Sequence, residues 1–352
     1  MINIAYSQQL FQQTLFMVNP YILNPALAGS EDFVDIKLGH RNQWTGFEDT
    51  QNEGGVAPTT SYISAHSTVG KPHEYYRDPR HENDRWHGVG GFVSRDRAGA
   101  FSTTAFYGSY SYSLALSKPN EGTAKYGFNG ADKPIGVRLT LGAHVGAIQH
   151  SIDGSNLRSA NAINNNGRTD NTIDGLGDRG RDFSPDASLG LWLYSNSFYA
   201  GAAVRRVLGS RATFADSSVF DFSRNFSIMG GYKFYLNNSI SLEPLAIVRA
   251  EVGSPLSADL NLLVAYDNTT SSRSLYNKGN VTNLHVYGGL TYRYDAAVAV
   301  ILGAIIQNRY EIAYSFDFTT TALSTTQNGT HEVTLGYRIL PSRRIHNAED
   351  HF

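Results

Sequence analysis

The sequence predicts a closed antiparallel transmembrane β-barrel of about 14 strands. Three features predict this fold class: apolar and polar residues alternate along most of the chain, the alternating runs are long, and no apolar run suits a membrane-spanning helix. The longest uninterrupted apolar run, residues 296–306, has about half of the roughly 20 residues that such a helix needs. Alternation places every second side chain on one face of a strand.

The alternation is clearest between residues 135 and 147. One predicted face is apolar, with Ile135, Val137, Leu139, Leu141, Ala143, Val145 and Ala147, and the other is polar or small, with Gly136, Arg138, Thr140, Gly142, His144 and Gly146. Residues 34–39 and 187–194 alternate in the same way. No charge falls on these apolar faces. That pattern is typical of a surface in contact with lipid, where a Lys or Arg at the midplane costs about 2–4 kcal/mol.

Fourteen such runs are predicted as strands. They cover residues 33–42, 58–67, 86–96, 102–116, 134–149, 185–195, 197–207, 223–236, 239–252, 256–267, 282–294, 297–307, 309–318 and 330–340. The number is even, as bacterial single-chain barrels require, and many runs reach the roughly 9–11 residues of a tilted transmembrane strand. Tyrosines near strand ends predict an aromatic girdle at the headgroup layers, although aromatic residues also simply favour strands. These tyrosines are Tyr107, Tyr110, Tyr112, Tyr292, Tyr294, Tyr310 and Tyr314.

The connections between the predicted strands differ greatly in length. Residues 196–197, 236–239 and 308 are predicted to form short hairpin turns, whereas residues 150–183 are predicted to form a large polar, glycine-rich loop. If both termini are periplasmic, strand parity places 150–183 outside the cell, together with 42–56 and 317–330. Parity then places three long connections, 68–85, 117–133 and 268–281, in the periplasm. Porin-type barrels keep their periplasmic turns short. Connections as long as these would therefore be unusual on that side, and their length suits binding of a periplasmic partner.

The composition excludes several classes of function. The chain has 29 basic and 31 acidic side chains, with a formal charge of -2, so no strong positive field would attract nucleic acid. With no cysteine, a thiolate metal site, a catalytic cysteine and disulfides are absent. No Gly-x-Ser-x-Gly elbow is present, and no Gly-x-Gly-x-x-Gly or Walker loop opens a predicted helix. We therefore predict neither an enzyme nor a cofactor.

Two segments, one rich in histidine and one acidic, contain residue types that bind metals. His73, His81 and His87 lie near Glu82 and Asp84, but their spacing matches no zinc site. Asp170, Asp174, Asp178 and Asp182 recur every four residues, yet without the residue order of an EF-hand. Solvated loops are the expected structure of both segments, and no metal is predicted.

The segment before the first strand is too apolar to extend into water. Residues 8–30 include Phe11, Leu15, Phe16, Tyr21 and Ile22, so we expect them to dock in the barrel lumen or against its periplasmic rim. The domain organisation is then an N-terminal segment 1–30, a barrel 31–340 and a C-terminal tail 341–352. Residues 1–9 are too short for the signal peptide that export requires, and we expect that leader to precede this sequence.

Polar residues near the last hairpin form another candidate site. His331 and Glu332 begin the last predicted strand, and Asp317 ends its neighbour, so their side chains could approach across the hairpin. They could form a rim network that stabilises barrel closure or could contact a partner.

Several motifs, in order and spacing, resemble the PorP/SprF family of type IX secretion and gliding-motility outer-membrane proteins. The resemblance begins with residues 24–30 (NPALAGS) and 41–44 (RNQW). It continues through 96–101 (DRAGAF), 185–192 (PDASLGLW), 199–201 (YAG), 288–293 (GGLTYR), 312–317 (IAYSFD) and 329–333 (GTHEV). The tail 341–352 departs from the family, whose members usually stop near an aromatic strand end.

The resemblance implies an outer-membrane barrel that works with type IX components or holds a secreted surface protein such as an adhesin. Its partners would be outer-membrane lipid and those proteins. Candidate partner-binding or structural residues are Asn24, Pro25, Gly29, Arg41, Asn42, Trp44, Asp96, Asp317, His331 and Glu332. Two alternatives stay open at this point: a passive porin-like solute channel, which needs an open polar lumen, and a soluble β-sandwich or adhesin, in which apolar faces pack together.

Overall fold

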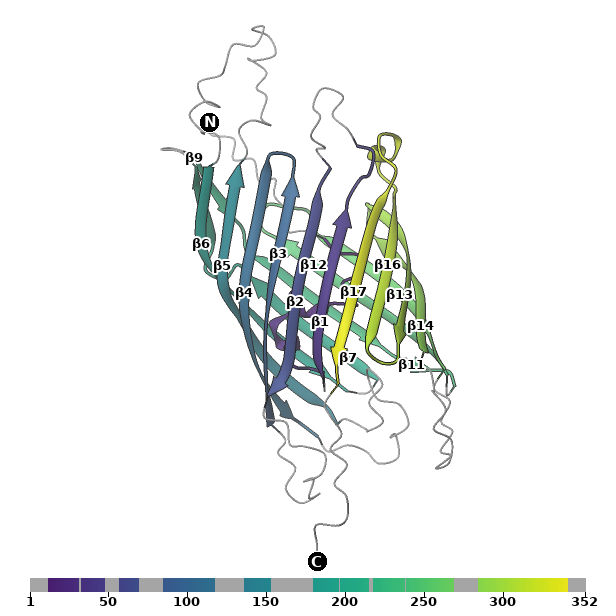
Figure 1. The fold of residues 1–352 in the computed structure, drawn as a ribbon. Coiled ribbons are helices and arrows are strands. Elements are labelled where there is room, and N and C mark those ends of the chain that lie inside the picture. The colour runs from purple at the N-terminus through teal and green to yellow at the C-terminus, as the bar shows by residue number, and fades with distance from the viewer. Residues whose placement is uncertain are drawn as a thin grey trace, which may run out of the picture.

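The protein is a closed antiparallel barrel in a computed structural model (Figure 1). The structure describes residues 12–31, 33–47, 57–69, 85–117, 136–152, 180–195, 197–214, 218–237, 239–268 and 284–340. Each strand of the barrel wall pairs with the next wall strand along the chain, and the ring closes where β1 pairs with β17. Closure gives each strand of the wall a partner on both sides, as a sheet in lipid requires.

The barrel wall consists of 14 wall strands, called staves here. β10 and β11 count as one of them, because they are two parts of one interrupted strand between β7 and β12. The strands are β1 (Val34–Asn42), β2 (Thr59–Val69), β3 (Arg85–Ala98), β4 (Phe101–Ala115), β5 (Arg138–Ile152), β6 (Gly180–Tyr194), β7 (Phe198–Arg205), β10 (Asn225–Tyr232), β11 (Phe234–Tyr235), β12 (Ile240–Glu251), β13 (Ser257–Asn268), β14 (Leu284–Arg293), β15 (Ala297–Ile306), β16 (Tyr310–Thr319) and β17 (Thr330–Ile339). The predicted fold class and number of strands are confirmed.

The structure also shows strand where the sequence predicted a loop. β5 and β6 extend to Ile152 and back from Gly180, so both ends of the predicted loop 150–183 belong to the sheet. A separate hairpin, β8 (Ser210–Phe214) and β9 (Ser218–Phe222), lies between β7 and β10. The first difference arises because β5 and β6 remain paired up to Ile152 opposite Gly180, past the residues that alternate in polarity.

The two ends of the barrel are named here as Figure 1 shows them. At the lower end β1 begins and β17 ends, with Val34 opposite Ile339. At the upper end β1 continues toward β2 and β16 connects to β17. Strand parity therefore brings the connections 153–179 and 320–329 to the upper end, and 70–84, 116–137 and 269–283 to the lower end.

The side chains alternate between lipid and lumen as predicted. Leu141 and Val145 on β5 are exposed on the outer face, whereas Arg138, Thr140 and His144 are buried inside. Among the predicted girdle tyrosines, Tyr107 is the exception, because it faces the lumen and donates to Asp186, while Tyr110 faces outward. Among the described residues, no helix has the length and apolar character needed to cross a membrane.

The outer face is expected to tolerate apolar residues and reject charge. Val145 lies at the middle of β5 and is 66% exposed, so Val145→Arg should lower the free energy of unfolding from vesicles by about 2–4 kcal/mol. Denaturant titration of the reconstituted barrel measures this value. Val145→Leu is the control and should leave stability nearly unchanged. A Val145→Arg variant as stable as the wild type would contradict lipid exposure of this face.

Candidate functional site: a lumen plug and its anchors

Residues 12–30, called the plug here, lie inside the barrel and cross much of its length. At the upper end Gln12 donates to Ser257 at the start of β13, with 3.4 Å between Nε2 and Oγ. At the lower end Thr68 near the end of β2 donates to the carbonyl of Gly29 over 3.2 Å. The chain therefore runs down through the lumen and then turns into β1. Docking of the N-terminal segment in the lumen, the first of the two predicted locations, is thereby confirmed for the described part of that segment.

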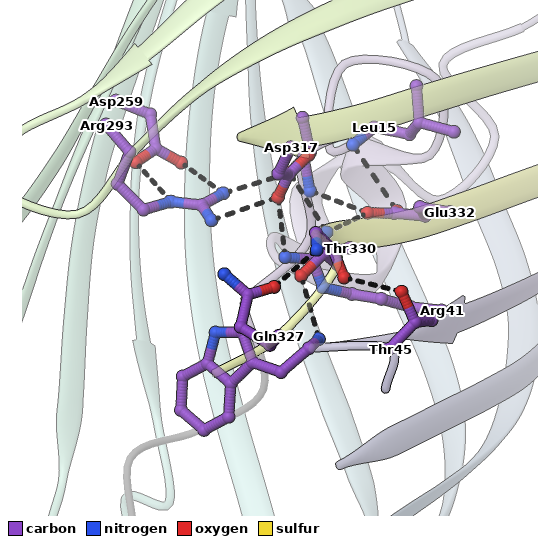
Figure 2. A network of polar contacts seen from close by, with 12 residues as sticks. Leu15, Arg41, Thr45, Asp259, Arg293, Asp317, Gln327, Thr330 and Glu332 are labelled. Carbon is purple, nitrogen blue, oxygen red and sulfur yellow. Dashed lines mark hydrogen bonds and ion pairs between the residues drawn. The ribbon is translucent and has the colours of Figure 1, made fainter. Parts of the chain in front are cut away.

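The upper part of the plug is held by a buried polar network, called the anchor cluster (Figure 2). It comprises Thr14 of the plug and six wall residues: Arg41, Arg249, Asp259, Arg293, Asp317 and Glu332. Three guanidinium groups face three carboxylates, so the cluster can be electrically neutral. A neutral, hydrogen-bonded set is the form in which charges are tolerated away from water.

Arg41 is the central cation of the anchor cluster. Its Nη1 lies 2.8 Å from Glu332 Oε2, and its Nη2 lies 2.7 Å from Asp317 Oδ2. The same guanidinium donates to Thr14 Oγ1 over 3.0 Å. Arg41 is only 4% exposed, so these contacts replace water at Nη1 and Nη2.

Thr14 uses both its backbone and its side chain in the anchor cluster. Its N–H donates to Glu332 over 2.8 Å, and its hydroxyl donates to Asp317 over 2.7 Å. Arg293 donates to the same hydroxyl over 3.1 Å and also pairs with Asp259. The plug is thus part of the network, and moving it would remove at least one hydrogen bond from each of Arg41, Arg293, Asp317 and Glu332.

A second group of charges holds the middle of the plug. Lys37 Nζ lies 3.2 Å from Asp35 and 3.4 Å from Glu311, and Arg338 lies 3.0 Å from Glu311. Lys37 also donates to the carbonyl of Val18. This set has two positive and two negative groups, so its balance resembles that of the anchor cluster.

An aromatic pocket surrounds Tyr21 at mid-height. The ring centroid of Tyr21 lies 4.6 Å from that of His66, 5.4 Å from His144 and 6.1 Å from Phe92. Its hydroxyl hydrogen-bonds Ser109 of β4. Because β2, β3, β4 and β5 all contribute, this single side chain joins the plug to four strands.

Residues 24–29 pack against strands that have glycine at the points of contact. Asn24 caps the short 3₁₀ helix η2 (Pro25–Leu27) by accepting from the Ala26 N–H, and it donates to the carbonyl of Leu191 over 3.0 Å. A Cβ at Gly88 would lie 1.9 Å from the Ala28 carbonyl oxygen, and one at Gly142 would lie 2.4 Å from the Ala26 nitrogen. Glycine at these positions allows the close approach of the plug backbone.

Eight of the ten predicted site residues fall into three groups. Asn24, Pro25 and Gly29 are in the plug, and Arg41, Asp317 and Glu332 meet in the anchor cluster. Trp44 and Asn42 lie near the upper end, where the Trp44 N–H donates to Thr330 and Asn42 pairs with His331 in the sheet.

His331 and Asp96 lie outside the anchor cluster. His331 faces outward and contacts Tyr314, 2.8 Å from Nδ1 to the hydroxyl. The predicted approach of His331 to Asp317 is therefore wrong, because neighbouring residues of a strand face opposite ways. Asp96 accepts from Thr60 on β2 over 2.6 Å.

The sequence interpretation missed Thr14, Lys37, Arg249, Asp259, Arg293 and Glu311 as members of the plug contacts. Their signal was present, because each wall residue among them is a charge on the polar face of an alternating strand. Which charges meet could not be read from alternation alone.

The tail 341–352 and the acidic loop residues Asp170, Asp174 and Asp178 lie outside the described residues, as do His73 and His81. Within the described part of the chain, no group of three His, Cys, Asp or Glu is placed to hold a metal.

The model of the family described as type IX secretion system membrane protein PorP/SprF matches residues 5–337. The chain belongs to the PorP/SprF family. Family membership together with the barrel fold places the protein in the outer membrane. No curated protein matches the chain.

Solved barrels with similar folds include two toluene transporters. TbuX of Ralstonia pickettii is 12% identical, with a TM-score of 0.48, and the match covers 94% of each chain. TodX of Pseudomonas putida is 12% identical, with a TM-score of 0.44, over 90% of this chain and 92% of that one. A Pseudomonas aeruginosa FadL homologue is 11% identical, with a TM-score of 0.46, over 89% and 92%. At this level of identity the likeness is limited to the fold.

Loss of the central cation should release the plug. Arg41→Met leaves Asp317 and Glu332 buried beside each other with less compensation, which should destabilise the protein by about 3–5 kcal/mol. The midpoint of thermal unfolding in detergent and the rate of proteolysis within residues 12–30 report the change. Arg309→Met, at an exposed hairpin position, is the control. The anchor role is refuted if the two variants behave alike.

Proposed function

We propose that this PorP/SprF barrel is a docking component of the type IX machinery, which binds an export partner or holds a secreted surface protein such as an adhesin. The observation that carries the proposal is the plug, which is bound to the wall at three points through Thr14, Val18 and Tyr21. A lumen occupied in this way is suited to presenting surfaces at its ends rather than to passing solutes.

The lengths of the connections support docking at the lower end. Connections 70–84, 116–137 and 269–283 all belong to that end. We propose that the lower end is periplasmic, because the first wall strand, β1, begins there and the last, β17, ends there. A periplasmic partner can then reach all three connections. The upper end, with connections 153–179 and 320–329, would then face outward and suit the secreted surface protein.

The domain roles follow from the same arrangement. We assign the N-terminal segment 1–30 to plugging the lumen, residues 31–340 to the membrane-spanning barrel, and residues 341–352 to a tail. Asn24, Pro25 and Gly29 would support binding indirectly by fixing the plug. Asn42 and Trp44 would shape the upper end, because they lie where β1 leaves the membrane.

Shortening one end at a time should separate the two binding roles. Replacement of residues 119–134 by a short Gly-Ser linker is expected to abolish co-purification of type IX components from native outer membranes. The matched variant, in which residues 154–178 are replaced, should keep those components and lose the surface protein from the cell surface. Barrel abundance, measured by immunoblot, should stay unchanged in both. Retention of all partners by both variants would contradict docking through these connections.

A porin-like channel is the second candidate, favoured by the polar lumen wall and by a cavity of about 170 Å³ beside the plug. Conductance in planar bilayers distinguishes the two functions. The wild-type barrel should show no stable ion current, because the plug fills the lumen. Gly142→Leu should conduct, since the new side chain displaces the plug at Ala26. Gly108→Leu is the control, because a Cβ there meets nothing closer than 3.9 Å. Steady wild-type current would instead favour the channel.

A further inference from the structure

The backbone pairing of β10 and β11 with β12, called the β10–β12 seam here, is interrupted. Between β10 and β12 the paired residues run from Asn225 opposite Glu251 to Gly231 opposite Leu245. Pairing resumes only with Phe234 opposite Leu242. The other pairings between neighbouring described staves run without such a break.

Pro244 explains the interruption. The register places it opposite Tyr232, and proline has no N–H to donate to the carbonyl across the seam. The Leu236 N–H donates to the carbonyl of Ile240, so even-numbered residues of β12 direct their polar groups toward this seam. Proline is normally confined to edge strands and bulges, yet here it lies within a closed sheet. The seam therefore lacks one hydrogen bond of the wall.

Two hollows meet at this seam from opposite sides of the wall. The lumen cavity of about 170 Å³ and an outer groove of about 580 Å³ both have Gly230, Leu245 and Ala246 in their lining. Gly230 and Ala246 have little or no side chain, so the wall between the hollows is thin. The outer groove lies on the lipid-facing surface, where Leu260, Leu262 and Leu290 line it.

The inner cavity can hold part of a hydrocarbon chain. Trp192, Met229 and Leu263 belong to the apolar part of its lining, beside the plug residues Phe16 and Val18. The lining also has a polar part, which includes Lys37, Glu243 and Glu311. A cavity of roughly 150 Å³ lined by apolar side chains is known to bind benzene, so by size the apolar part of this cavity has room for a chain end but not for a whole lipid. The remainder of the chain would lie in the outer groove.

We propose that the β10–β12 seam is a binding site for the acyl chain of a bilayer lipid, which passes from the outer groove through the wall into the cavity beside Trp192. Acyl chains are the molecules that surround this face of the barrel, and burial of the chain against apolar side chains is favourable. The missing hydrogen bond at Pro244 lowers the cost of separating the strands. This site depends on the barrel lying in a bilayer and is independent of the role in secretion.

Tryptophan fluorescence in brominated lipid tests the site. The chain has three tryptophans, and Trp44→Phe with Trp86→Phe leaves only Trp192, which is 3% exposed. This single-tryptophan protein is reconstituted in vesicles of phosphatidylcholine, with or without bromine on the acyl chains. A chain in the cavity brings bromine into contact with Trp192, so emission should be lower in the brominated vesicles.

A disulfide across the seam distinguishes two sources of quenching: an acyl chain that has entered the cavity, and brominated chains that remain outside the wall. The chain has no cysteine, and Met229 lies opposite Ile247, where facing Cα atoms are about 4.5–5.5 Å apart and suit a disulfide. Oxidised Met229→Cys with Ile247→Cys should regain emission in brominated vesicles, and reduction should reverse the gain. The matched control, Ile301→Cys with Ser315→Cys across β15–β16, should remain quenched.

A second variant blocks the outer groove without cysteines. A Cβ at Gly230 would have its nearest neighbour, the Tyr199 carbonyl oxygen, at 3.2 Å, so Gly230→Leu should fold and fill the groove. It should regain emission, whereas Gly108→Leu should stay quenched. Folding is checked by heat-modifiable migration on gels. Equal emission in both lipids, or quenching that persists in the oxidised pair and in Gly230→Leu, overturns the proposal.

Discussion

The rest of the structure depends on the separation of apolar and polar side chains across a closed wall. In lipid, each backbone polar group needs an internal partner, so the sheet must close. Closure then places one side chain of every two in the lumen, and in this protein many of those side chains are charged. Arg41, Arg293 and Lys37 cannot remain unpaired in that confined space. Compensation of lumen charge is therefore the constraint that organises the inside of the barrel.

The plug participates in that compensation and does not simply occupy space. Thr14 offers an N–H and a hydroxyl to a neutral set of three cations and three anions, and Val18 offers a carbonyl to Lys37. Next to these polar contacts, Tyr21 and Ile22 are buried among aromatic and aliphatic neighbours. The plug is thus polar where the wall is charged and apolar where the wall is aromatic or small. This match favours a resident segment over a transient one.

The one break in the wall stands out against this regularity. The register between other neighbouring described staves has no internal gap, but β12 has a proline directed toward β10 and β11. The same place has small residues on the outer face and a cavity on the inner face. A defect in the hydrogen-bond ladder, a thin wall and two adjoining hollows together indicate a site rather than an accident of packing.

The sequence by itself determined the barrel, because a period of two fixes which residues face lipid and which face the lumen. It therefore also determined that Lys37, Asp259 and Arg293 face inward. Only the tertiary structure decided which of these charges meet, since Arg41 joins Asp317 and Glu332 through ring closure between the first and last strands. Likewise, the apolar segment before β1 had to dock, but its path depended on Gly88 and Gly142 of β3 and β5 lying beside residues 26–28. Alternation is a local property of the chain, whereas these contacts join residues that only the closed sheet brings together.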